Sequence, residues 1–111
     1  MTPSLHQQRC SHQSGPGLSD AAQAAMLTQV KGWTIDHGAA GSMLRQRFQF
    51  NNFHTTMAFV NAVAWIAHEQ DHHPDLAVSY QHCTVSWNTH SVGGLSLNDF
   101  ICAARVDQLS T

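Results

Sequence analysis

Residues 51–74 read NNFHTTMAFVNAVAWIAHEQDHHP, and the fold of this chain can be worked out from them. From Phe53 onward, apolar residues recur every three or four positions, which is the pattern of an amphipathic helix. An asparagine pair precedes this pattern and supplies a residue type that caps helix N-termini. Pro74 forbids further helix and pushes the residue before it towards extended backbone. We therefore predict a helix over about residues 53–70 that lies across a sheet.

Short strands are predicted on both sides of this helix. Residues 43–50 nearly alternate between apolar and polar side chains, which is the pattern of a half-buried antiparallel strand. The other predicted strands cover residues 32–36, 76–80 and 83–89, with a turn at 37–41 and a tight connection at 81–82.

Two further helices complete the predicted order. Ser19 can cap a helix that runs to about Val30, and Ser96 with Asp99 resembles a capping box for a last helix that ends near Gln108. The order is therefore α-β-β-α-β-β-α. It indicates an α+β fold with a single four-stranded antiparallel sheet and helices packed on one face.

The N-terminal part of the chain differs in composition from the rest. Residues 1–17 are rich in Gln, Ser, His, Gly and Pro and have almost no apolar content, so we expect a mobile arm. Residues 18–111 are predicted to form one domain around a single core.

Composition narrows the class of protein. The chain has a formal net charge of -2 and only five Lys plus Arg, which argues against nucleic acid as a partner. No apolar run reaches the roughly 20 residues that span a bilayer, and no secretory signal is visible. The three cysteines are Cys10, Cys83 and Cys102, and their odd number and wide spacing indicate reduced thiols. We expect a cytoplasmic protein without a membrane partner, in which Cys83 and Cys102 are inert core thiols.

Four histidines, His68, His72, His73 and His90, lie at the predicted end of the long helix or follow it. The unperturbed pKa of histidine lies nearest neutrality, so a cluster of imidazoles indicates either proton transfer or metal binding. His68 and His72 are four residues apart and would share a helix face if the helix persisted that far. A simpler interpretation is that they mark a solvated helix end, where a cation also suits the helix dipole.

The sequence leaves the chemistry of these histidines open. A metal site would take His68, His72 and His73 together with His90 or Asp75 as ligands. The zincin motif H-E-x-x-H is absent, however, because HEQDH at residues 68–72 has one residue too many. No cysteine has ligand spacing either, so we expect no resident metal. In the acid/base interpretation, one imidazole protonates a leaving hydroxyl while another removes a proton elsewhere on the same substrate.

Several motifs in a fixed order resemble one known family. AHEQDHHPD at residues 67–75 is followed by Thr89-His90, by Gly94-Leu95-Ser96 and then by Asp99. This order resembles the pterin-4a-carbinolamine dehydratases, also called 4a-hydroxytetrahydrobiopterin dehydratases. The resemblance extends from about residue 18 to the C-terminus and includes Gly32-Trp33 and the segment 48–53. NDFI at residues 98–101 and AAR at 103–105 fit the bacterial type.

The resemblance implies a cofactor-free lyase. Such an enzyme removes water from the 4a-carbinolamine left by aromatic amino-acid hydroxylases, and a reductase then recycles the quinonoid dihydropterin. Carried over from the family, the catalytic residues are His72, His73 and His90, with Asp99 as a supporting carboxylate, and the substrate-binding residues are Trp33, Pro74 and Thr89.

The roles of these residues are hypotheses. His73 or His90 would protonate the departing 4a-hydroxyl, while His72 takes up the proton lost from the ring nitrogen. Asp99 would orient a donor, although a carboxylate three residues after Ser96 is equally what a capping box requires. Trp33 could equally be a core anchor at the start of a strand.

The chain departs from the family pattern at one position. Family members often carry an acidic residue four positions before the first motif histidine, where this chain has His68.

The resemblance also implies an oligomer and allows other functions. Family members assemble as homodimers or homotetramers, and animal members also bind a homeodomain transcription factor. A non-catalytic protein-binding or coactivator module is therefore the alternative function. A histidine-rich metal carrier is a third.

Overall fold

The computed structural model describes residues 3–38 and 41–110. Its elements in chain order are η1 (Leu5–Gln7), α1 (Asp20–Leu27), β1 (Thr34–Gly38), β2 (Gly41–Gln49), α2 (Phe53–Gln70), β3 (Asp75–Val78), β4 (His82–Trp87), η2 (His90–Val92), α3 (Leu97–Asp107) and η3 (Gln108–Ser110). The η elements are 3-10 helices, each of three residues.

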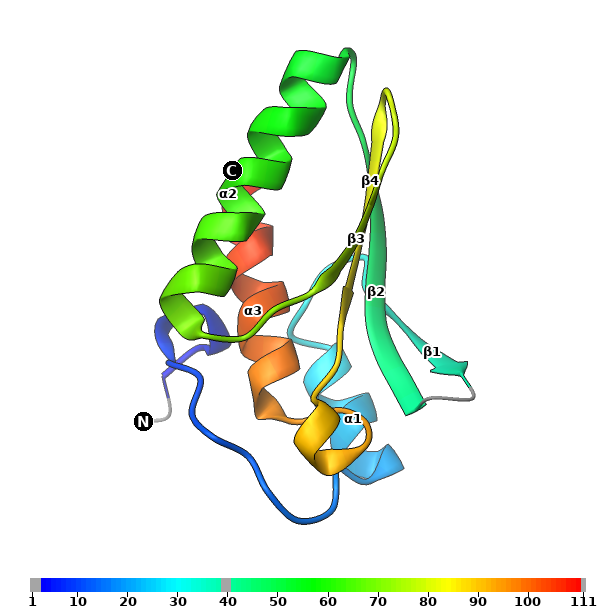
Figure 1. Ribbon diagram of the computed structural model, residues 1–111. Coiled ribbons are helices and arrows are strands. Elements are labelled where there is room, and N and C mark those ends of the chain that lie inside the picture. The colour runs from blue at the N-terminus through cyan, green and yellow to red at the C-terminus, as the bar shows by residue number, and fades with distance from the viewer. Residues whose placement is uncertain (1–2, 39–40, 111) are drawn as a thin grey trace.

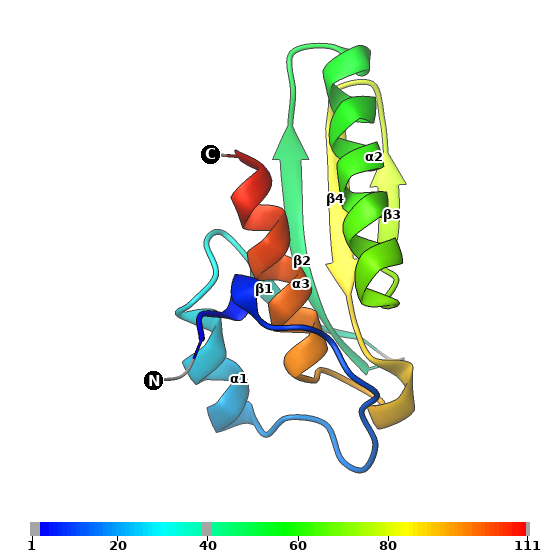
Figure 2. The ribbon, with the colours of Figure 1, turned by 90° about the vertical axis from the view of Figure 1, so that its left-hand side faces the viewer.

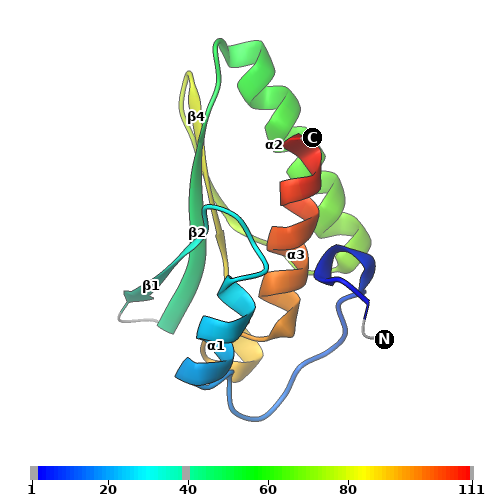
Figure 3. The same cartoon turned by 180° about the vertical axis from the view of Figure 1, so that it is seen from behind.

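The four strands form one antiparallel sheet in the order β1-β2-β4-β3. The helices α2 and α3 lie side by side across one face of this sheet, as Figures 1 and 3 show from opposite sides. Leu44 on β2 pairs with Trp87 on β4, and both side chains are fully buried between the sheet and the helices. The predicted α+β class, the element order and the four-stranded antiparallel sheet are confirmed.

The long helix α2 has the predicted bounds because both of its ends are determined locally. At its start, the Oδ1 atom of Asn52 accepts a hydrogen bond from the backbone N–H of Thr55 over 2.8 Å. At its end, Asp71 adopts a left-handed backbone conformation with φ of 50°. The chain then leaves the helix towards Pro74, where further helix is forbidden.

The first helix is shorter than predicted. α1 begins after the Ser19 cap, as expected, but ends at Leu27 and not near Val30. Beyond it, the N–H groups of Gln29 and Val30 donate to carbonyls three residues earlier, so the chain tightens into turns. This tightening brings Val30 into the core, where it is 7% exposed.

The strand ends also differ from the prediction. β1 runs to Gly38 and β2 begins at Gly41, and the two remaining residues of the predicted turn, Ala39 and Ala40, lie outside the described residues. β4 ends at Trp87, two residues early. The reason is that Thr89 forms an isolated bridge with Gly94, which draws residues 90–92 into the short helix η2. His90 therefore lies in η2 and not on a strand.

The described part of the predicted arm lies along α3, as Figure 2 shows. Leu5 is 4% exposed and belongs to the core. Farther along, the side-chain amide of Asn98 donates to the backbone carbonyl of Ser11 over 2.7 Å. These contacts give residues 3–17 a place in the fold, while their mobility stays a prediction. Within the described residues, no helix is long and apolar enough to cross a membrane.

Candidate active site

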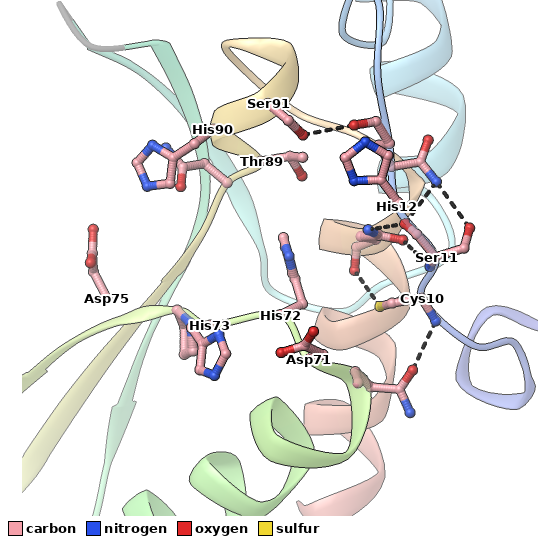
Figure 4. A pocket seen from close by; sticks show the side chains of 15 residues that line it. Cys10, Ser11, His12, Asp71, His72, His73, Asp75, Thr89, His90 and Ser91 are labelled. Atoms are coloured by element: carbon pink, nitrogen blue, oxygen red, sulfur yellow. Dashed lines mark hydrogen bonds between the residues drawn. The ribbon is translucent and has the colours of Figure 1, made fainter.

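A pocket of about 560 Å³ opens where α2 ends, between the start of β3 and the end of β4. Figure 4 shows its lining residues, which come from four separate parts of the chain. His72, His73 and Pro74 come from the segment after α2, and Thr89 and His90 follow β4. The structure thus brings five of the seven predicted site residues to one pocket.

Asp99 lies next to the pocket, where it binds His72. It is fully buried, and its Oδ1 atom accepts a hydrogen bond from the Nε2–H group of His72 over 2.7 Å. Such a charge-assisted bond fixes the orientation and the tautomer of the imidazole. The carboxylate that orients His72 therefore comes from α3, and the replacement of an acidic residue by His68 does not deprive His72 of a partner.

The second oxygen of Asp99 completes a small polar network. Its Oδ2 atom accepts from the Thr89 hydroxyl over 2.8 Å and from the Ser96 N–H over 2.9 Å. Ser96 and Asp99 also form the predicted capping box of α3. One oxygen of Asp99 therefore caps the helix, while the other binds a histidine of the pocket.

The His72 ring is held on a second side by Trp87. The two rings stack with centroids 5.7 Å apart and an interplanar angle of 10°. Burial by itself lowers the pKa of His72, but the hydrogen bond and the negative charge of Asp99 outweigh it, with a further contribution from Cys10. The pKa of His72 is consequently raised above its ordinary value. The site thus holds an oriented imidazole that gains a proton readily.

The other two histidines differ from His72 in exposure. His73 and His90 are both exposed and line the pocket from the segments after α2 and β4. In Figure 4 they lie on one side of His72, while His12 lies on the other. The pocket therefore combines one oriented, nearly buried imidazole with two that solvent and a substrate can reach, which is the composition that acid/base chemistry requires.

Two residues singled out in the sequence lie elsewhere. Trp33 is 4% exposed, packs edge-on against Phe48, and donates its indole N–H to Oδ1 of Asp107 over 2.8 Å. It is not among the residues that line the pocket, and its setting is that of a core anchor. His68 is also outside the lining, and its ring lies 5.4 Å from that of Trp65 on α2.

One wall of the pocket comes from a segment that sequence reasoning missed. Residues 10–13 line it, and the backbone N–H of Cys10 donates to Oε1 of Gln70 over 2.8 Å. The segment has no apolar periodicity, so no local signal could place it. In the described ranges, no group of three or more His, Cys, Asp or Glu side chains is arranged to hold a metal ion.

Sequence comparison gives long matches to one family. The family model for pterin 4 alpha carbinolamine dehydratase matches residues 16–109. A protein of Stenotrophomonas maltophilia (strain R551-3), provisionally named as such a dehydratase, is 51% identical over 108 residues, which cover 96% of this chain and 91% of that protein. A protein of Nitrosospira multiformis with the same provisional name is 50% identical over 94 residues, covering 85% of this chain and 80% of its own.

Two solved structures share the fold. One is the crystal structure of a transcriptional coactivator/pterin dehydratase from Brucella melitensis, with a TM-score of 0.79 and 25% identity, covering 86% of this chain and 99% of that one. The other is a pterin dehydratase-like protein described as a RuBisCO assembly factor in the alpha-carboxysome. It has a TM-score of 0.60 and 26% identity, and the match covers 71% of this chain and 89% of that one.

Proposed function

This chain belongs to the pterin 4 alpha carbinolamine dehydratase family, and we propose that it dehydrates 4a-hydroxytetrahydrobiopterin to quinonoid dihydropterin. The observation that carries the proposal is the oriented His72 at a pocket lined by His73 and His90. The substrate must lose a hydroxyl group from C4a and a proton from a ring nitrogen. Three imidazoles around one pocket supply an acid and a base for these two transfers.

His72 is assigned as the base. Because its Nε2–H group donates to Asp99, the neutral ring has its lone pair on Nδ1, which is the nitrogen left for the substrate. When Nδ1 takes the ring proton of the pterin, the imidazolium that forms is stabilised by the Asp99 carboxylate. Asp99 does not touch the substrate in this account and acts as a positioning residue.

His73 or His90 is assigned as the acid. Both are exposed at the pocket, so a protonated imidazole at either position can deliver its proton to the departing 4a-hydroxyl. The C4a–O bond breaks, the oxygen leaves as water, and the electron pair released by the ring nitrogen completes the new double bond. Pro74 and Thr89 are proposed to shape the substrate site, Thr89 through its bond to Asp99. No metal or organic cofactor is needed for these steps.

We also propose a source for the substrate and a fate for the product. The carbinolamine would be supplied by an aromatic amino-acid hydroxylase, and the product would be reduced to the tetrahydropterin, in the cytoplasm.

We further propose that the protein forms a homodimer or homotetramer. It is supported by large apolar side chains that remain exposed on the single chain, including Phe53 at 50%, Trp65 at 60% and Tyr80 at 65%.

A protein-binding module is the second candidate function. It is favoured by the same exposed side chains and by the two solved relatives, one described as a coactivator and one as an assembly factor. The two candidates make different predictions in a coupled hydroxylase assay that follows the decay of the carbinolamine absorbance. Decay faster than the spontaneous rate supports the dehydratase. Decay at the spontaneous rate, with folded protein present, would leave the binding function.

A further inference from the structure

The N-terminal segment runs along α3 and contacts it at successive turns of the helix. The contacts pair Gln8 with Arg105, Cys10 with Cys102, and Ser11 with Asn98. The first is a bond from the guanidinium of Arg105 to a backbone carbonyl, and the last is a two-way bond between the Asn98 amide and the backbone of Ser11. The two cysteines lie between these polar contacts, so their relative position is held on both sides.

The two sulfur atoms are in direct contact. The Sγ atoms of Cys10 and Cys102 lie 3.6 Å apart, although the residues are 92 positions apart in the chain. A disulfide requires a sulfur separation of about 2.05 Å, so an approach of about 1.5 Å would join them. Cys102 is fully buried on α3, whereas Cys10 is only partly buried and lines the pocket. The Cys10 thiol is thus reachable from the pocket, whereas the Cys102 thiol is not.

We propose that Cys10 and Cys102 are an oxidisable dithiol that reacts with a hydroperoxide and closes to a disulfide, which links the N-terminal segment to α3. This site lies beside the histidines and does not depend on the proposed dehydratase activity.

The surroundings of Cys10 favour its thiolate, which is the form that attacks a peroxide. Either thiol can donate the hydrogen bond between the two sulfur atoms; with Cys102 as the donor, this bond stabilises the Cys10 thiolate and is the main cause of a lowered pKa of Cys10. Burial acts in the opposite direction, while the positive charges of His72 and Arg105 lower the pKa further and Asp99 raises it. The net direction is downward, and Cys10 is also the thiol of the pair that lines the pocket, so we assign it as the attacking thiol.

The peroxide oxidises the two thiols in two steps. In the first, the Cys10 thiolate attacks the peroxide, the O–O bond breaks, and Cys10 becomes a sulfenic acid while an alkoxide or hydroxide leaves. In the second, the Cys102 sulfur attacks the sulfenic sulfur, and the disulfide forms as water departs with the Cys102 proton. Two electrons pass from the thiols to the peroxide.

The first step also prepares the second. In the reduced protein the pKa of Cys102 is strongly raised, first by its hydrogen bond to Cys10 and then by burial and by the Cys10 charge. Conversion of Cys10 to a neutral sulfenic acid removes the thiolate and its charge from this set of causes, while burial remains. Cys102 then loses its proton more easily, at the moment when its sulfur has an electrophile within contact distance.

Cys83 provides an internal comparison in the same chain. It is fully buried on β4, paired in register with Phe48, and burial raises the pKa of its thiol. It should therefore stay reduced under conditions that oxidise the pair. All three cysteines are free thiols in the structure.

The test is to oxidise the reduced full-length protein with hydrogen peroxide, alkylate the remaining thiols after denaturation, and map the peptides by mass spectrometry. We expect an intramolecular Cys10–Cys102 peptide, alkylation at Cys83 only, and reversal by dithiothreitol. The linkage should also raise Tm by about 5 to 10 °C, because it constrains the unfolded chain. Three alkylated thiols, chains joined to one another through Cys10, or a Cys10 sulfinic acid without a cross-link would each overturn the proposal.

Two variants make the test specific. Cys83→Ala should form the same disulfide, since it lacks only the comparison thiol. Cys102→Ala should stop at a Cys10 sulfenic acid that dimedone traps, and a failure of dimedone to label Cys10 in the folded variant would contradict the assigned order of attack. Because peptide mapping of the wild-type chain needs no substitution, the proposal can be tested even if Cys102→Ala does not fold.

Discussion

The Nε2 atom of His72 lies 2.7 Å from Oδ1 of Asp99, joining the segment after α2 to the first turn of α3. The same carboxylate accepts hydrogen bonds from Thr89 and from the backbone of Ser96. One buried charge therefore ties together the three chain segments that form the inner side of the pocket.

The stability of the protein should depend on pH through His72. Its pKa is raised in the folded state from the ordinary value of 6.5. The stabilisation is therefore fully present below about pH 6.5 and is lost as the pH rises through the folded pKa. Relative to His72→Gln, wild type should lose free energy of unfolding as the pH rises above about 6.5. Chemical denaturation at pH values on both sides of 6.5 measures the free energy of unfolding of both proteins. If the advantage of wild type over His72→Gln grew with pH, the raised pKa of His72 would be contradicted.

Removal of one exposed imidazole should impair catalysis without unfolding the protein. We expect His73→Ala to lower kcat by about 100-fold, the lower end of what a positioned acid or base contributes. His54→Ala is the matched control, because His54 is exposed on the first turn of α2 and does not line the pocket. Equal activities for the two variants would remove His73 from the mechanism.

Trp33 should prove to be a stability residue. Trp33→Phe loses the hydrogen bond to Asp107 and part of the packing against Phe48, so it should lower the free energy of unfolding by about 1 to 2 kcal/mol. The KM for the carbinolamine should stay within about twofold of wild type. A large rise in KM with unchanged stability would instead support the substrate-binding role that the family resemblance implies.

Chelation should leave the reaction rate unchanged, because the acid and the base proposed here are both imidazoles. The measurement is the rate of carbinolamine decay by protein dialysed against a chelator and by the same protein with Zn²⁺ restored. A loss of activity that zinc reverses would favour a metal-dependent mechanism over the acid/base one.

Much of the fold was predictable because its signals are local. The bounds of α2 follow from the cap at Asn52 and the stop at Pro74. The capping box of α3 was predictable because Ser96 and Asp99 are only three residues apart in the sequence. The end of β4 was not, because it depends on a bridge between Thr89 and Gly94 that only the folded chain makes.

The site was predictable where motifs mark it and not where distant contacts build it. His72, His73 and His90 were proposed from motifs whose order resembles the family, but the bond from His72 to Asp99 spans 27 positions. The pocket wall at residues 10–13 depends on side chains of α2 and α3, and its own composition carries no periodicity. Trp33 was open to two interpretations because a tryptophan at a strand start has the same sequence pattern in a core as at a pocket.

The role of the His72–Asp99 pair is tested most directly by the pH dependence of kcat in wild type and Asp99→Asn, measured after circular dichroism has shown both to be folded. As a base, His72 must be neutral, so kcat should rise with pH through its raised pKa. Loss of the carboxylate leaves burial as the main influence and lowers that pKa. The rising limb of Asp99→Asn should therefore move to lower pH, with a maximal rate about 10- to 100-fold below wild type. A limb that stays in place would contradict the claim that Asp99 sets the proton affinity of the catalytic histidine.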